Sequence, residues 1–266
     1  MLWVHGGIGD QICAEPTIRF ALDTLKGKKI SLAALNPDLF HHLHHRLDRI
    51  YDTTKQQPPA QKFYNLPLFL NDKSVAWEFL CGAYIHALDA ACLFAFRATL
   101  PDSYRAIHLY PKPENTERAE ALDVPKKKVV FVHPGKHWPS KTFPKEFWDS
   151  VIDNLIKRGI RPVLIGATQP AENNKLTSRG TVDVKTEGCL DLRNELSILD
   201  TLALFEKSTL RGTSALLTND SAPLHLAAAT RIHIGYISLA KDPELVNSRH
   251  RHISHRSKHF GKGGLS

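Results

Sequence analysis

The chain has 266 residues, 42% of them hydrophobic, which is enough for one large or two modest domains with ordinary buried cores. Lys and Arg outnumber Asp and Glu by 35 to 27, and the net charge of +8 favours anionic partners such as nucleotide diphosphates, nucleic acid or an acidic membrane surface. The four cysteines form no CxxC pair, which argues against a zinc site or a disulfide framework and fits a reducing cytosol.

The segments that could direct a chain to a membrane lack the required patterns. The N-terminus has no basic region and reaches two glycines within a few residues, so we expect no signal peptide. The longest apolar stretch, Val75 to Phe96, contains Glu78 and Asp89, and we expect a buried or interfacial helix there rather than a membrane span.

A glycine-rich turn lies near the start of the chain. Leu2 to His5 predicts a short strand, and Gly6-Gly7-Ile8-Gly9-Asp10 then begins a helix that Gly27 ends. Three glycines in four positions allow the backbone to approach a ligand or a neighbouring segment closely, but the GxGxxG spacing of a dinucleotide site is absent. Asp10 either caps the helix or belongs to a functional site at the N-terminal end of the helix.

The next segments predict a strand from Lys29 to Leu35 and a helix that Asn36 caps and Pro37 begins. In this helix His41 and His45 are four positions apart and share a face. No neighbouring Cys, Asp or Glu completes a preferred coordination set, so the histidines indicate a solvated, pH-sensitive helix face rather than a metal site.

The rest of the chain predicts a second sheet after a helix and a linker. The helix runs from about Ser74 to Ala98, and the Pro- and Glu-rich segment Pro111 to Pro125 is the predicted interdomain linker. The alternation that follows predicts parallel strands with crossover helices, and hence two Rossmann-like domains, residues 1–115 and 116–266, with parallel sheets facing a central cleft. The predicted strands are Val129–Val132, Pro162–Ile165, Ala215–Leu217 and Ile232–Ile237, and the predicted helices are Phe147–Ile156 and Ser197–Lys207.

A polar turn follows the strand that ends at Leu217. Asn219-Asp220-Ser221 comes next, and a helix of small residues begins near Pro223. A strand, a polar turn and a helix start are how α/β proteins build anion sites, and His225 lies one helical turn after Ser221. We expect a phosphate or a sugar at this turn; the alternative is a capped helix with a packed histidine.

Three blocks together resemble glycosyltransferase family 9, the ADP-heptose:lipopolysaccharide heptosyltransferases. They are Gly7-Ile8-Gly9-Asp10 with Pro16 downstream, His133-Pro134-Gly135 followed by Ser140-Lys141-Thr142-Phe143-Pro144, and Asn219-Asp220-Ser221-Ala222-Pro223-Leu224-His225-Leu226-Ala227. The resemblance implies a GT-B fold with an acceptor-binding first half and a nucleotide-sugar-binding second half. It also implies an inverting, generally metal-independent transfer from a nucleotide-diphosphate sugar, ADP-linked, with no further cofactor.

The resemblance assigns roles that suit the chemistry. The acceptor hydroxyl must lose a proton, and Asp10 resembles the family's general base. Negative charge develops on the departing diphosphate, and Lys141 resembles the family's donor-phosphate lysine. The other residues expected to bind the donor are Ser140, Thr142, Glu172 for the ribose, Asp220, Ser221, Ala222 and His225, with Lys136 as a second cation and Gly7 and Gly9 in the acceptor-side loop.

The chain departs from the family pattern at particular positions. Ala222 stands where the signature usually has Gly, at a position that could need close approach or positive φ, and Phe143 stands where Trp is common. The chain ends at Ser266 soon after the last predicted strand, so we expect a shortened C-terminal end. The basic tail, Arg249 to Lys262, predicts either a solvated segment or contact with an anionic membrane surface or lipopolysaccharide phosphates.

The leading hypothesis is an inverting transferase that moves a heptose-like sugar to a lipopolysaccharide or other envelope glycan, in the cytoplasm or at the inner face of the membrane. One alternative is a nucleotide-sugar epimerase or hydrolase on the same fold. Another is a non-catalytic protein that binds a nucleotide or an anionic glycan. No helix-turn-helix, RRM or zinc module is recognisable, so we expect no nucleic acid partner.

Overall fold

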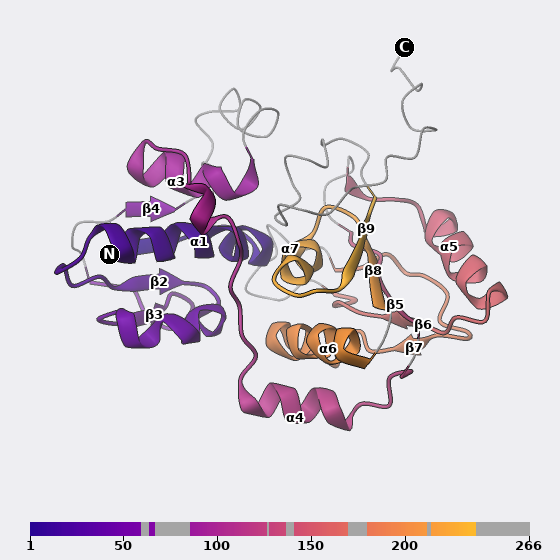
Figure 1. The fold of residues 1–266 in the computed structure, drawn as a ribbon. Coiled ribbons are helices and arrows are strands. Elements are labelled where there is room, and N and C mark those ends of the chain that lie inside the picture. Colours follow the sequence, from indigo (N-terminus) through magenta and orange to yellow (C-terminus); the bar gives the residue numbers. More distant parts are fainter. Residues whose placement is uncertain are drawn as a thin grey trace, which may run out of the picture.

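The computed structural model describes residues 1–59, 64–66, 86–126, 128–136, 141–169, 180–211 and 214–237. In this part of the chain two parallel sheets form, one in each half (Figure 1). The predicted α/β class with parallel sheets is therefore confirmed. None of the helices described is long and apolar enough to cross a bilayer.

The first sheet has the strand order β3-β2-β1-β4, and all its pairs are parallel. The strands are β1 (Leu2–Val4), β2 (Leu32–Ala34), β3 (Ile50–Asp52) and β4 (Tyr64–Leu66). Because β2 and β3 extend the sheet on one side of β1 and β4 lies on the other, the connection order reverses between β1 and β4.

Helices of both α and 3-10 type accompany this sheet. Helix α1 (Ile8–Thr24) packs against α3 (Ala87–Phe96), and the 3-10 helices are η1 (Pro37–Arg46) and η2 (Asp102–Tyr104). Asn36 and Pro37 take the predicted cap and first-turn positions of η1, although the backbone is 3-10 rather than α. The residues from Ser74 to position 85 of the predicted long helix lie outside the described residues.

The second sheet has the strand order β7-β6-β5-β8-β9, again all parallel. Its strands are β5 (Val129–His133), β6 (Pro162–Leu164), β7 (Leu190–Asp191), β8 (Ser214–Thr218) and β9 (His233–Tyr236). Here the order reverses between β5 and β8, which pair in register over their whole length.

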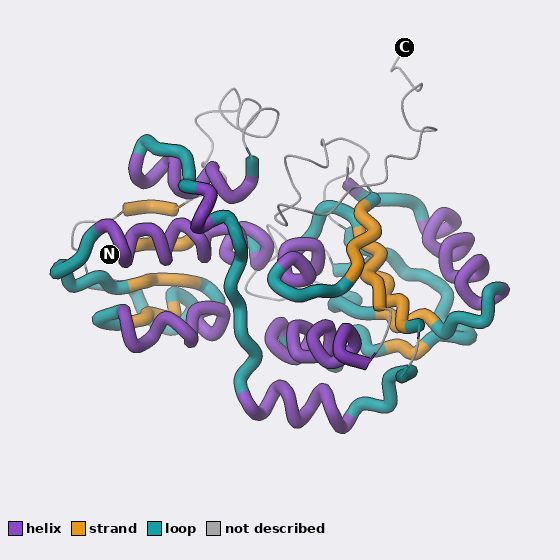
Figure 2. The backbone as a smooth tube through the Cα atoms, viewed as in Figure 1, coloured by secondary structure: helices purple, strands orange, loops and turns teal. Residues whose placement is uncertain are grey.

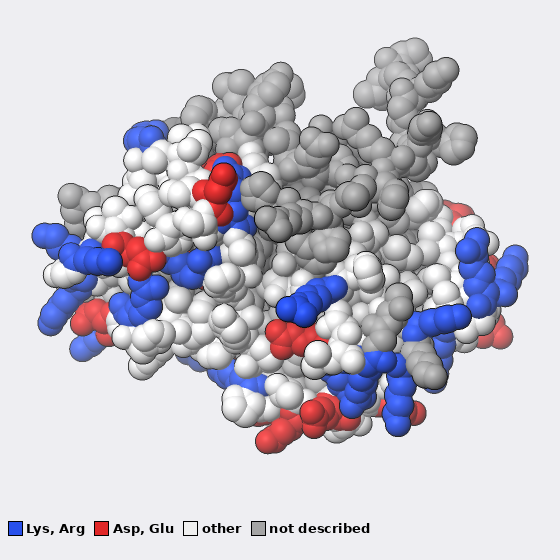
Figure 3. Space-filling model, viewed as in Figure 1, with Lys and Arg blue, Asp and Glu red and all other residues white. Residues whose placement is uncertain are grey.

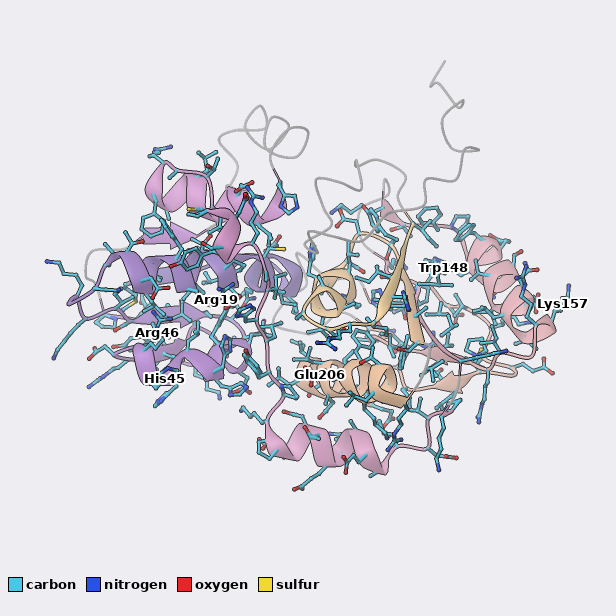
Figure 4. The ribbon with its side chains drawn as sticks, in the orientation of Figure 1. Arg19, His45, Arg46, Trp148, Lys157 and Glu206 are labelled. Atoms are coloured by element: carbon cyan, nitrogen blue, oxygen red, sulfur yellow. The ribbon has the colours of Figure 1, made fainter. Side chains whose placement is uncertain are left out.

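Helices cover both faces of the second sheet. Successive residues of β5 point to opposite faces and therefore pack against different helices. Phe131 packs against Phe205 of α6 (Ile198–Arg211), in the same apolar cluster as Leu226 of α7 (Ala222–Ala228). Val132 instead belongs to a cluster with Trp148 of α5 (Lys145–Lys157), whose ring points toward the sheet (Figure 4). The larger cluster continues into the first half through α1 and α3, so the two halves share buried apolar contacts.

The predicted linker is not irregular: residues Pro113–Ala121 form α4, which packs beside α6 (Figures 1 and 2). Pro113 occupies its first position, where a missing N–H costs nothing, and Asn115 donates to Asp200 of α6 at 2.9 Å. The helix within this linker was not predicted, because a Pro- and Glu-rich segment suits a helix start as well as a loop. The predicted boundary at 115/116 falls inside α4.

Candidate functional site

The glycine-rich turn and the polar turn both leave the carboxyl end of a strand where the connection order reverses. In α/β sheets this is the usual position of a ligand crevice. The glycine-rich turn follows β1, and Asn219-Asp220-Ser221 follows β8, whose last residue, Thr218, is in register with His133 of β5. The two turns therefore belong to the two expected binding edges.

Asp10 closes the glycine-rich turn on itself. It is the third residue of α1, and its Oδ2 accepts the N–H of Gly7 at 2.7 Å. Gly6 has φ +91°, and a Cβ there would lie 2.5 Å from the same oxygen. Both the backbone conformation and the lack of space for a side chain therefore require glycine at this position. Asp10 therefore caps the helix, which was one of the two alternatives for this residue. The same hydrogen bond holds its carboxylate at the N-terminal end of α1.

Gln11, which is fully buried, fastens this turn to the neighbouring strand connection. Its Nε2 donates to Gly6 O at 3.2 Å, and its Oε1 accepts the N–H of Asn36 at 3.0 Å. The sequence analysis assigned Gln11 no role, because its two partners become neighbours only when the sheet forms.

The start of α1 lies directly against α7, as the ribbon also shows (Figure 1). A Cβ on Gly9 would lie 3.0 Å from Cδ2 of His225 and 3.4 Å from Cα of Ala222. His225 is buried, and its Nδ1 lies 3.2 Å from Sγ of Cys13. The glycine loop and the polar turn, more than 200 residues apart, are therefore brought together.

Ala222 is the first residue of α7, and its backbone φ is not positive. The positive φ that this position could have required is therefore not found, and the close approach at this contact is provided by Gly9 on the other helix.

Lys141 and Asp220 form an ion pair at this edge, with 2.5 Å between Nζ and Oδ2. Their side chains are only 18% and 10% exposed, so the pair is largely buried. Charge interactions are screened less in a buried pair than in water. An ammonium carries three donors, so one that contacts Asp220 can also donate to the oxygens of an anion.

Asn219 connects the polar turn to the His133-Pro134-Gly135 segment. It is buried, and its Nδ2 donates to Gly135 O at 2.7 Å and to Lys141 O at 2.6 Å. The sequence analysis quoted Asn219 as part of a block but gave it no function.

His133 is buried beneath the turn and contacts its hydroxyls. Its Nδ1 lies 3.1 Å from Ser221 Oγ and 3.3 Å from Thr218 Oγ1. Burial lowers the pKa of His133 to about 4, so its ring is neutral near pH 7. Ser221, which was predicted to bind the donor, is therefore positioned by a neutral imidazole.

The remaining predicted residues divide into placed and undescribed ones. Lys136 is exposed and Thr142 is partly buried beside Lys141, while Phe143 is buried against Phe147 and Trp148. Ser140, Glu172 and the basic tail from Arg249 to Lys262 lie outside the described residues.

The histidine-rich helix is only partly the solvated face that was expected. His41 Nε2 lies 2.7 Å from Tyr110 O, and the side chain of His42 is 11% exposed and lies 3.5 Å from Glu15. His44 and His45 are exposed, and His45 lies with Arg46 away from α7 (Figure 4). Among the residues described, no group of three or more His, Cys, Asp or Glu side chains could hold a metal ion.

Basic side chains are spread over the molecule. On the face drawn in Figure 3, Lys and Arg lie at both ends with Asp and Glu among them. The charge on the described part of this face therefore does not form one continuous basic stripe of the kind that tracks a nucleic acid backbone.

A family model described as glycosyltransferase family 9 (heptosyltransferase) matches residues 92–234, more than half of the chain. The chain belongs to glycosyltransferase family 9. The resemblance inferred from the three blocks is confirmed, and the protein is a glycosyltransferase. A sequence search among curated proteins found no significant match.

Solved structures of family 9 members share the fold. A family 9 glycosyltransferase from Veillonella parvula aligns with a TM-score of 0.63 and 14% identity, over 92% of this chain and 82% of that one. E. coli heptosyltransferase WaaC with ADP aligns with a TM-score of 0.52 and 14% identity, over 91% of this chain and 88% of that one. These likenesses confirm the predicted GT-B arrangement.

The heptosyltransferase TibC of enterotoxigenic E. coli also aligns, with a TM-score of 0.57 and 14% identity. The alignment covers 89% of this chain and 57% of TibC, which is described as dodecameric and iron-containing and was solved in complex with ADP-D-β-D-heptose.

Proposed function

We propose that this family 9 enzyme transfers a heptose-like sugar, with inversion, from an ADP-linked donor to a lipopolysaccharide or other envelope glycan. The observation that carries the proposal is the α1–α7 contact, which sets the Asp10 turn against the turn that pairs with Lys141. The nucleotides bound by WaaC and TibC support the choice of donor.

The donor diphosphate binds to the cationic side of this junction. Lys141 donates to the phosphate oxygens while Asp220 holds its ammonium in place, and Ser221 of the same turn and His225 of α7 also contribute. A fixed cation in a poorly solvated site stabilises the charge that develops on the leaving group. Thr142 lies next to Lys141, and Ser140 and Glu172 complete the proposed donor-binding residues.

Asp10 acts as the general base on the acceptor side, in the loop that contains Gly7 and Gly9. The acceptor hydroxyl gives its proton to the Asp10 carboxylate, its oxygen bonds to the anomeric carbon, and the carbon–phosphate oxygen bond breaks with its electron pair leaving on the diphosphate. The base comes from the first half and the leaving-group cation from the second. That separation suits a single displacement, which inverts the anomeric centre.

In this proposal each of the two halves binds one of the two substrates. Residues 1–115 bind the acceptor and residues 116–266 the nucleotide sugar, and no metal or other cofactor takes part in the proposed steps. We propose that the reaction takes place in the cytoplasm; the net charge of +8 supports contact with an anionic surface such as the inner face of the membrane.

The test begins with the donor. Thermal shift with a panel of nucleotide sugars identifies the one that raises the melting temperature most, since a ligand that binds only the folded state stabilises it. Asp10→Asn is then assayed with that donor and a lipopolysaccharide core acceptor. The amide still accepts from Gly7 N–H, so we expect kcat to fall about 10²–10⁴-fold while the donor Kd changes less than about twofold.

Asp23→Asn is the matched control, since Asp23 lies on the same helix, α1, far from the turn, and bonds to Arg46 and Tyr104. It should leave kcat within about twofold of the wild-type value. Undiminished transfer by Asp10→Asn, or equal losses of transfer and donor affinity, would show that Asp10 serves the fold rather than the reaction.

A further inference from the structure

Asn219 is the one residue of the polar turn that the proposed chemistry does not use. It is 1% exposed and lies between Thr218, the last residue of β8, and Asp220. Its Nδ2 donates to two backbone carbonyl oxygens, Gly135 O at 2.7 Å and Lys141 O at 2.6 Å. Both N–H bonds of the amide are thus used on carbonyls six positions apart in the chain.

The fit around this amide is close. A Cβ on Gly135 would lie 2.5 Å from Asn219 Oδ1, so the segment after β5 can reach the amide only as glycine. Within the described part of the chain no donor bonds to Oδ1, so the side chain acts through its two N–H groups. An aspartate of the same shape could not make these bonds while ionised.

One of these two hydrogen bonds holds the backbone of Lys141. Lysine has a long flexible stem, and an anion site gains from holding it in one place. Asn219 holds the main-chain carbonyl of Lys141, and the next residue, Asp220, holds its ammonium at 2.5 Å. Two consecutive residues of one turn therefore hold the backbone of Lys141 and the tip of its side chain.

We infer that Asn219 is a positioning residue that sets Lys141 for the donor diphosphate. The inference rests on the proposed function, in which Lys141 binds that diphosphate. Asn219 itself touches neither substrate in this assignment, so its effect on nucleotide binding passes through the lysine.

A double-mutant cycle separates this role from a general effect on folding, because residues that act through one another give non-additive changes. The Kd for ADP is measured by calorimetry for the wild type, Asn219→Ala, Lys141→Met and the double variant. We expect Asn219→Ala to weaken ADP binding at least about fivefold in the wild type and less than about twofold in the Lys141→Met background.

Equal losses in both backgrounds, or no loss in the wild type, would overturn the inference while leaving Lys141 in the site. Unchanged ADP affinity in Lys141→Met alone would remove the proposed role of the lysine, and the inference with it. If Asn219→Ala does not fold, Asn219→Asp takes its place in the cycle, since it keeps the shape and loses both donors.

Asn115→Ala is the matched control. It also removes a partly buried hydrogen bond donated by a side-chain amide, from Asn115 Nδ2 to Asp200 Oδ1. This bond joins α4 and α6 and does not involve the turn. Its ADP affinity should stay within about twofold of the wild-type value, even if its melting temperature falls.

Discussion

At the scale of single residues, the turn after β8 contacts a buried histidine that is uncharged near pH 7. His133 is enclosed tightly: a Cβ on Gly135 would lie 2.9 Å from its Cε1, and a Cβ on Gly166 would lie 2.7 Å from its Cδ2. Burial within this enclosure lowers the pKa of His133 from 6.5 to about 4. The neutral ring can then share a hydrogen bond with Ser221 Oγ.

This pKa predicts how stability varies with pH. Between about pH 6.5 and pH 4 the unfolded chain protonates this histidine while the folded protein does not, so acidification through that window destabilises the fold. The loss from His133 should reach about 3 kcal/mol near pH 4 and be absent above pH 7. Urea unfolding at pH 4.5 and pH 7 measures it in the wild type and in His133→Gln.

The variant should lose clearly less stability than the wild type between the two pH values, whatever its stability at pH 7. The same loss in both proteins would mean that His133 takes up its proton in the folded state as easily as in the unfolded chain.

Single residues also show where sequence reasoning stopped. Asp10, Lys141 and Asp220 were proposed as site residues because each stands in a block whose chemistry is recognisable. Asn219 and His133 stood in the same blocks, but their roles depend on partners 78 to 88 positions away, and a sequence does not state which side chain meets which carbonyl. Only the sheet register brings them together.

At the scale of elements, the junction of the two halves depends on a helix residue without a side chain. Gly9, the second residue of α1, lets that helix approach α7 closely enough to touch Ala222 and His225. Glycine normally weakens a helix, and here its small size sets the distance between the two helices.

Substitution at Gly9 should therefore impair transfer in proportion to side-chain size. Gly9→Ala requires the ring of His225 to move by a few tenths of an ångström, while Gly9→Val forces the two helices apart. Because a misplacement of about 1 Å can cost about 100-fold in rate, we expect Gly9→Val to lower kcat at least about tenfold and Gly9→Ala less.

Thr24→Val places the same side chain at the exposed last residue of α1 and should leave kcat within about twofold. Steady-state assays of the three variants make the comparison. A Gly9→Val enzyme with wild-type kcat would mean that the α1–α7 distance does not matter for transfer.

Elements with a clear period or a long apolar run were predictable, among them α1, β5, α5, α6, β8 and β9. Strands β3, β4 and β7 were missed because two or three residues are too few to show an alternation and, unlike β1, β2 and β6, they carry no apolar run. Helix α4 was missed because its composition is that of a linker and its packing on α6 is a tertiary contact.

At the scale of the whole molecule, the two sheets place their order-reversal edges toward one junction. The glycine turn comes from the first sheet and the Lys141–Asp220 pair from the second, and a shared apolar cluster joins the halves. The alternation of strands and helices in the sequence predicted two parallel sheets facing a cleft, and the three blocks implied which residues line it. The sequence could not predict that α1 and α7 meet through Gly9, because no local pattern encodes a contact between domains.

The central claim is that Asp10 and Lys141 serve the same sugar from opposite sides. The most direct measurement is a crystal structure with ADP-2-deoxy-2-fluoro heptose, the analogue with which WaaC was solved. We predict the diphosphate within about 2.7–3.1 Å of Lys141 Nζ and the Asp10 carboxylate facing the anomeric carbon from the side opposite the diphosphate. A diphosphate bound away from Lys141, or an Asp10 carboxylate that does not reach that side of the sugar, would contradict the account.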